Sequence, residues 1–157
     1  MKKVVLWFVV AISTIACESN PGFKEIRDFK KSEWKIAHKQ TFEFEIKDIQ
    51  KTYAFNYLIR TSVSYPFFNL YLNEALTGPD GKQVSTSMDE VILFNEKTGK
   101  PYGDGLGDIY DNRVPMPKLV KYKFDKPGKY KLSIGHNMRP DPLTGIMSIG
   151  LEIVEAK

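Results

Sequence analysis

Cysteine, histidine and long apolar runs are scarce in this chain of 157 residues, and each shortage excludes a class of structure. The sequence holds one cysteine and two histidines. A single cysteine cannot form an internal disulfide bond, and no spacing of these few residues suggests a zinc site. The apolar run at residues 4–12 is too short to cross a bilayer comfortably as a permanent helix. No long segment has a 3.6-residue period, so β-structure is the expected class.

The chain also has little excess charge of either sign. Its 23 basic and 19 acidic residues give a formal charge of +4, and without Lys2 and Lys3 the balance falls to 21 − 19 = +2. Binding to nucleic acid needs a basic stripe rather than scattered charge, so we expect no nucleic-acid partner. Hydrophobic residues make up 42% and aromatic residues 13% of the sequence, which is enough for the core of one domain.

The first residues have the pattern of an export signal. Lys2 and Lys3 precede the apolar residues 4–12, and small Ala16 stands directly before Cys17. This order of charge, apolar run and small residue is typical of a secretory signal, and its end resembles the lipobox of bacterial lipoproteins. We therefore expect a lipoprotein signal peptide at residues 1–16 and a covalent lipid on Cys17. The alternative is ordinary signal-peptidase cleavage beside an unmodified cysteine.

After the cysteine we expect a short tether and then one domain. Residues 17–22 are polar and rich in turn formers, and residues 23–157 form the domain. Residues 41–47 alternate between apolar and charged side chains, which predicts a half-buried strand. Residues 53–60 alternate in the same way, and we expect these two strands to pair as a hairpin.

The rest of the domain repeats this pattern of short strands and turns. Residues 23–37 predict a loop with at most one short strand, and residues 95–117 predict a long loop. Further strands are expected at residues 67–72, 90–94, 119–124, 130–134 and 147–153. Seven or eight short strands of this kind predict an all-β fold, an antiparallel β-sandwich that is jelly-roll-like.

Several segments, in this order along the chain, carry a family resemblance. The strongest are Tyr65-Pro66-Phe67-Phe68-Asn69-Leu70 and Met138-Arg139-Pro140-Asp141-Pro142-Leu143-Thr144-Gly145. With Trp34 and the glycines of residues 103–107, they resemble the gliding motility lipoprotein GldH family across most of residues 17–154. The resemblance implies a lipid-bearing Cys17, a place in the cell envelope and no enzymatic activity. It also implies a role beside the gliding machinery and its associated protein secretion system.

The residues that carry catalysis in other proteins form no recognisable constellation here. Ser133 and Ser148 lie in predicted strands without a nucleophile motif, so we expect no catalytic residue. A glycine-rich loop offers oxygen ligands for calcium at Asp104, Asp108, Asp111 and Asn112, but their spacing does not match an EF-hand. Solvated turn residues are the alternative, and we expect no metal site. We also expect no cofactor, and the covalent lipid on Cys17 is the one added group that we expect.

Aromatic and basic residues at two turn-rich segments suggest a surface for a partner. Exposed aromatic and arginine side chains are common anchors of protein interfaces, although the same residues often pack in a core. The hypothesis is that residues 64–70 and 136–146 meet at one end of the sandwich. Its six candidate residues are Tyr65, Pro66, Asn69, Met138, Arg139 and Asp141.

The sequence thus predicts a non-enzymatic lipoprotein on the periplasmic face of the outer membrane. Its domain is expected to act as an interaction module that binds other envelope lipoproteins or components of the gliding and secretion machinery. The alternative is a glycan-binding lipoprotein in which Trp34 and exposed tyrosines stack on sugar rings.

Overall fold

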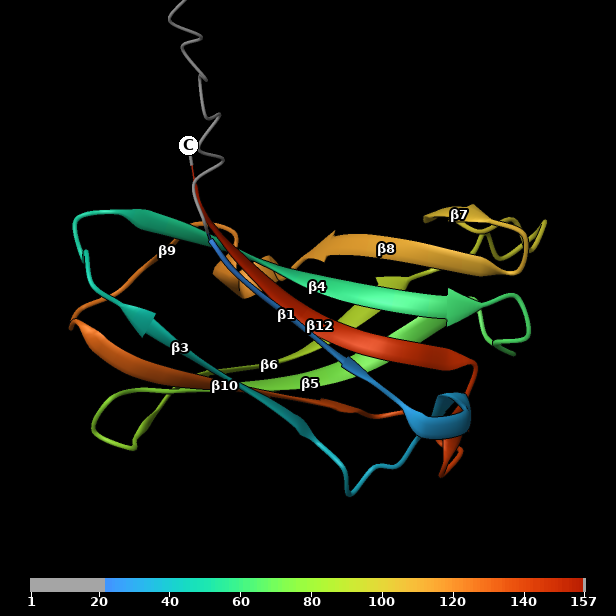
Figure 1. The fold of residues 1–157 in the computed structure, drawn as a ribbon, viewed down its shortest axis with the longest axis horizontal. Helices are drawn as coiled ribbons and strands as arrows, with labels where there is room; N and C mark the ends of the chain where they lie inside the picture. The colour runs from blue at the N-terminus through green and yellow to red at the C-terminus, as the bar shows by residue number, and fades with distance from the viewer. Residues whose placement is uncertain (1–21, 157) are drawn as a thin grey trace, which may run out of the picture.

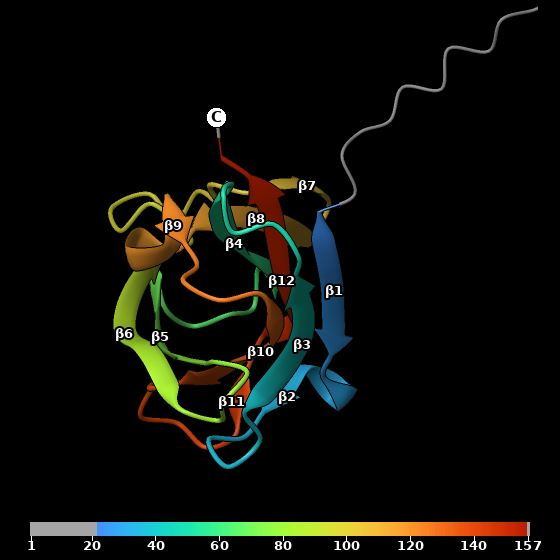
Figure 2. The same cartoon turned by 90° about the vertical axis from the view of Figure 1, so that its left-hand side faces the viewer.

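In a computed structural model, which describes residues 22–156, two antiparallel sheets face each other. Figure 1 shows the two layers, and Figure 2 shows them from one end. The first sheet contains β1 (Phe23–Asp28), β12 (Ile146–Glu155), β4 (Thr52–Ser62), β8 (Ile109–Pro115) and β7 (Asp104–Leu106), with β9 (Tyr122–Lys123) beside β4. The second contains β3 (Gln40–Ile46), β10 (Gly128–His136), β5 (Asn69–Thr77) and β6 (Gln83–Ile92). The domain also has a small two-stranded sheet, formed by β2 (Glu33–Trp34) and β11 (Leu143–Thr144). Two 3₁₀ turns complete the domain: η1 (Lys30–Ser32) and η2 (Pro117–Leu119).

The long strands pair as one ribbon that is folded over on itself. β1 pairs with β12, β3 with β10, β4 with β8 and β5 with β6, always antiparallel. Rolling such a ribbon into two sheets places β1-β12-β4-β8 against β3-β10-β5-β6, which is the jelly-roll order. The predicted all-β sandwich is confirmed. The expected signal peptide and Cys17 lie outside the described residues.

The core forms where the apolar faces of the two sheets meet. Phe42, Phe44 and Ile46 of β3 are buried, as their alternation predicts. In β4, Phe55, Tyr57 and Ile59 are buried. The predicted hairpin of these two strands is wrong, because β3 and β4 belong to different sheets. Their apolar faces pack across the sandwich, with the rings of Phe44 and Phe55 5.6 Å apart. Two strands that each bury one face can satisfy the same pattern in this way without sharing backbone hydrogen bonds.

Three strands of the first sheet run through segments that the sequence predicts as mainly loop. The predicted loop at residues 95–117 contains β7 and the seven-residue β8, and residues 23–28 form a full strand in β1. β8 buries only Asn112, and β1 buries no residue fully. A strand at the margin of a sheet is stabilised by backbone hydrogen bonds more than by an apolar face, so it has little hydrophobic period. The strand predicted at residues 119–124 is reduced to η2 and β9.

The strand registers define two ends of the sandwich. The chain enters at Phe23, which lies opposite Ile153, and β1 ends at Asp28, opposite Ser148. We call the entry side, with residues 46–52, 77–83 and 120–128, the tether end. The other side, with residues 62–69 and 137–145, is the distal end (Figure 1).

Replacing Gly145 by alanine should destabilise the domain by about 3 kcal/mol or more. Gly145 has φ +87°, and an added Cβ would lie 2.6 Å from the Cα of Tyr65, where neither backbone can move freely. Gly99→Ala is the matched control, because its φ of +67° is similar but nothing lies within 4 Å of the new Cβ. Strain alone should cost that control about 1 kcal/mol. If urea denaturation gave Gly145→Ala and Gly99→Ala equal losses of unfolding free energy, the contact with the Cα of Tyr65 would not be the cause.

Candidate functional site

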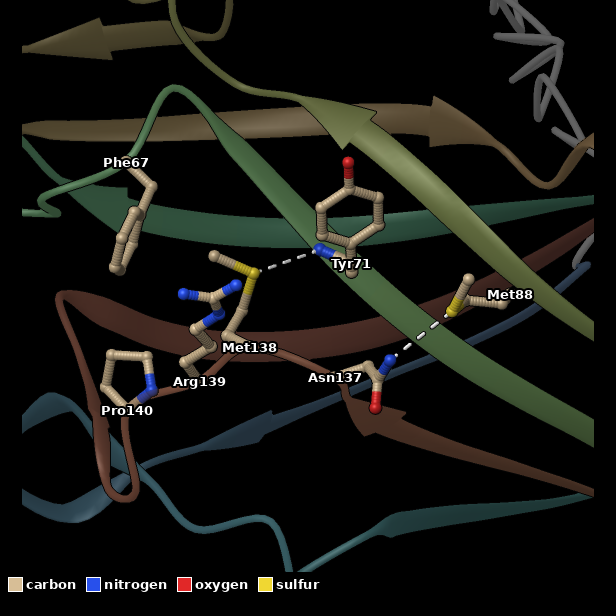
Figure 3. Close-up of a pocket in the computed structure, with 7 residues that line it drawn as sticks. All are labelled: Phe67, Tyr71, Met88, Asn137, Met138, Arg139 and Pro140. Carbon is tan, nitrogen blue, oxygen red and sulfur yellow. Dashed lines mark hydrogen bonds between the residues drawn. The ribbon is translucent and has the colours of Figure 1, made fainter.

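An open cavity of about 480 Å³ lies on the outer face of the second sheet, toward the distal end. We call it the distal groove. Its lining is mostly apolar, and it is made of Phe67, Tyr71, Met88, Asn137, Met138, Arg139 and Pro140 (Figure 3). The residues come from β5 and the loop before it, from β6 and from the segment that follows β10. A largely apolar concavity with few polar groups is the usual form of a binding site on a protein surface.

The floor of the groove is fixed by bonds between segments that are far apart in the sequence. The backbone N–H of Asn137 donates to the carbonyl oxygen of Tyr71 at 2.8 Å. The N–H of Tyr71 donates in return to the Met138 sulfur at 3.4 Å, and the Asn137 amide donates to the Met88 sulfur at 3.3 Å (Figure 3). The segment after β10 therefore lies firmly across the sheet, while methionine side chains can adapt to an apolar guest.

His136 supports this segment from the interior. Its imidazole is buried, with Nε2 3.1 Å from the carbonyl oxygen of Trp34, and its Nδ1 accepts the N–H of Met138 at 3.3 Å. Burial lowers the pKa of His136. An Nδ1 that accepts a hydrogen bond requires the neutral ring, so the neutral form is the one that positions Met138.

The charges around the groove leave one cation without a partner. Glu90 accepts the Asn69 amide at 2.6 Å, and its hydrogen bond and charge raise the pKa of the Tyr71 hydroxyl. The Asp141 carboxylate accepts the N–H of Ile36 at 3.0 Å. Within residues 22–156, the exposed Arg139 guanidinium forms no ion pair or hydrogen bond. The groove thus presents an apolar floor with an available positive charge at its rim.

The structure brings together the two segments proposed as a partner surface but separates their side chains. Met138 and Arg139 line the groove, and Pro66 is exposed beside it. Tyr65 is only 5% exposed, and its hydroxyl donates to the carbonyl oxygen of Asn69, so it packs in the core. Asp141 holds a loop through Ile36. Met138 is itself only 8% exposed, so the contacts available to a partner in this segment are concentrated at Arg139 and Pro140.

Sequence reasoning missed Tyr71, Met88 and Asn137. Tyr71 faces outward in β5 between the buried Leu70 and Leu72, and Met88 is 60% exposed on the neighbouring β6. Alternation in residues 69–77 distinguishes the two faces of the strand, but not which other segment covers the outer one.

The glycine-rich loop at residues 103–112 is the segment that the sequence offers for calcium. This loop forms the β7–β8 hairpin, in which the Asp111 carboxylate accepts two hydrogen bonds from the Arg60 guanidinium, at 2.8 and 2.9 Å. Asn112 is buried and contacts the carbonyl oxygen of Ile59. Across residues 22–156, no group of three or more histidine, cysteine or acidic side chains is arranged to hold a metal ion.

A model of the family described as GldH lipoprotein matches residues 22–153. The chain belongs to the GldH lipoprotein family. The gliding motility lipoprotein GldH homolog of Christiangramia forsetii is 30% identical over 153 residues, covering 92% of both chains. The gliding motility lipoprotein GldH of Flavobacterium johnsoniae is 27% identical over 161 residues, covering 98% of this chain and 96% of its own.

Among solved structures, an infectious bursal disease virus structure overlaps 95% of this chain and 37% of its own, with 16% identity and a TM-score of 0.39.

Membership of the lipoprotein family implies attachment to a membrane of the cell envelope. The part of the chain that the structure describes has no helix with the length and hydropathy needed to cross a bilayer.

Proposed function

We propose that this GldH-family chain is a non-enzymatic scaffold that is anchored through a lipid on Cys17 to the periplasmic face of the outer membrane. Its jelly-roll domain binds a component of the gliding machinery or of the associated secretion system through the distal groove. Full-length similarity to proteins named for gliding motility supports the biological setting. The apolar groove with the unpaired Arg139 at its rim carries the proposal of a binding role.

The chemistry of the groove specifies the kind of segment that fits it. Met88 and Met138 offer adaptable apolar contacts, and Arg139 offers a bidentate site for a carboxylate. The best match is a protein segment that places an apolar side chain next to an acidic one. The groove lies toward the distal end, away from the tether end, so a lipid on Cys17 would leave it open toward the aqueous compartment.

The glycan alternative loses its main support. Trp34 is fully buried, stacked on Phe29 at 4.8 Å, and Tyr57, Tyr65 and Tyr130 are also buried. These rings are not available to a sugar, which leaves Tyr102, 60% exposed outside the groove, and Tyr71 in the groove lining. A glycan site also needs several polar groups around its ring, whereas the groove offers mainly Asn137 and Arg139.

Capture of partners by the tagged, lipidated protein in mild detergent tests this function. Met88→Ser and Arg139→Glu change exposed groove residues, so the fold should persist while recovery of envelope partners falls roughly tenfold. Val84→Ser, on the same face of β6, and Lys100→Glu, near the distal end, are matched controls that should retain the partners. Equal recovery with all four variants would refute the groove as the binding site.

A further inference from the structure

A second surface lies at the tether end, where lysines gather beside the point at which the chain enters the domain. We propose that this surface, formed mainly by Lys121, Lys123 and Lys126 with Val120, docks on anionic lipid headgroups of the membrane that holds the anchor. The inference rests on the Cys17 lipid of the proposed function and adds the orientation of the domain on the membrane.

The segment that carries this surface is strongly one-sided in charge. Between Pro117 and Lys131 the chain has six lysines and a single acid, Asp125. Three of the lysines have partners within the fold: Lys118 donates to the carbonyl oxygen of Thr86 at 2.9 Å, Lys126 lies 3.8 Å from Asp80, and Lys131 lies 2.6 Å from Glu43. Within residues 22–156, Lys121 and Lys123 form no ion pair and are exposed.

Strand pairing places these lysines close to the anchor. β9 pairs Lys123 with Thr52, β4 pairs the adjacent Tyr53 with Glu155, and β12 pairs Ile153 with Phe23. Three strand spacings separate Lys123 from the entry of the chain, a distance of roughly 15 Å. Figure 2 shows β9 and the start of β1 on the same end of the domain.

The tether is short enough to hold this end against the bilayer. Cys17 precedes Phe23 by six residues, which span at most about 21 Å when fully extended. Lysines held this near to a charged surface are attracted by anionic headgroups, and the attraction falls off within a Debye length. Val120, 42% exposed between Leu119 and Lys121, adds an apolar contact for the interface.

Neighbouring acids cancel only part of this charge. Glu155 is paired with Lys51 at 2.8 Å, whereas the hydrogen bond that Asp48 accepts from the N–H of Gln50 does not offset its charge. The exposed Asp125 lies between Lys123 and Lys126 and offsets one lysine of the segment. Asp80 lies beside Lys126, although at 3.8 Å its pairing is loose. The positive surplus therefore falls on Lys121 and Lys123. Docking here would turn the distal groove toward the aqueous compartment.

Hydrogen exchange of the full-length lipidated protein tests the inference, with nanodiscs of phosphatidylcholine alone compared with a mixture containing phosphatidylglycerol. The amides of residues 118–128 should exchange at least about threefold more slowly on the anionic discs, and high salt should abolish the difference. Lys121→Glu combined with Lys123→Glu should also abolish it. Lys97→Glu with Lys100→Glu, the same charge change near the distal end, should not.

Recovery with the discs is measured in the same preparation and reports on the Cys17 anchor separately. A protein recovered with the discs whose exchange is equal on both membranes overturns the docking surface and leaves the anchor intact. Loss of the difference in the distal control would also overturn it. A protein that is not recovered with the discs contradicts the anchor and the docking that rests on it.

Discussion

Replacing Glu74 by glutamine should stabilise the domain by about 3 kcal/mol at about pH 8 and change its stability little at about pH 4. Glu74 points inward from β5 among Leu72 and Leu76 and is only 2% exposed. Within the described residues neither of its carboxylate oxygens has a hydrogen-bond partner. An ionised carboxylate in such a site is costly, and a neutral amide of the same shape avoids that cost.

The pH range follows from the pKa of this group. Burial, reinforced by the nearby Asp89 carboxylate, raises the pKa of Glu74 from 4.5 to about 7. Because the folded state then binds the proton more tightly than the unfolded state, the free energy of unfolding falls as pH rises from 4.5 to 7. The stabilisation that comes from protonated Glu74 is therefore fully present below pH 4.5 and is lost above pH 7.

Asp89 differs because it has partners. The Tyr57 hydroxyl donates to it at 2.9 Å and the Ser87 hydroxyl at 2.6 Å.

The measurement is urea denaturation of wild type and Glu74→Gln across this pH range. Glu96→Gln, in an exposed turn, is the control and should follow wild type. A Glu74→Gln curve parallel to that of wild type at every pH would contradict the account.

Replacing Cys17 by serine should move the protein almost completely from the membrane to the soluble fraction. The expected lipid is diacylglyceryl on the thiol, and each methylene buried in the bilayer contributes roughly 0.8 kcal/mol. Two or more long chains anchor a protein nearly permanently, whereas one chain gives only reversible binding. Loss of the thiol therefore removes several orders of magnitude of membrane affinity.

Detergent-phase partitioning of the mature protein measures this directly. Wild type should enter the detergent phase, and Cys17→Ser should remain in the aqueous phase. Ser19→Ala, two residues along the tether, is the control and should behave as wild type. A Cys17→Ser protein that still carries lipid and partitions with wild type would exclude Cys17 as the anchor.

The fold follows from the sequence wherever a strand buries one face. Phe42, Phe44 and Ile46 alternate with charged residues, and all three are buried as predicted. The same signal cannot tell which strand lies beside which, because packing across the sandwich and pairing within a sheet leave the same pattern. The error over β3 and β4 comes from this degeneracy.

The distal groove was only half predictable, for a different reason. Tyr71, Met88 and Arg139 are far apart in the sequence, and only the jelly-roll path of the chain brings them together in the groove. Tyr65 and Tyr71 are similar tyrosines near the start of β5, yet one faces the core and the other the groove. Composition around Pro66 cannot make that distinction, whereas the strand register can.

Photo-crosslinking in living cells tests the central claim, that the distal groove binds another envelope protein. A photoreactive amino acid at Met88 or Arg139 would be activated, and the same residue at Gln83, exposed nearer the tether end of β6, would serve as the control. The account predicts a discrete protein adduct from both groove positions and none from the control. Adducts that are absent from the groove positions, or equal at Gln83, would contradict it.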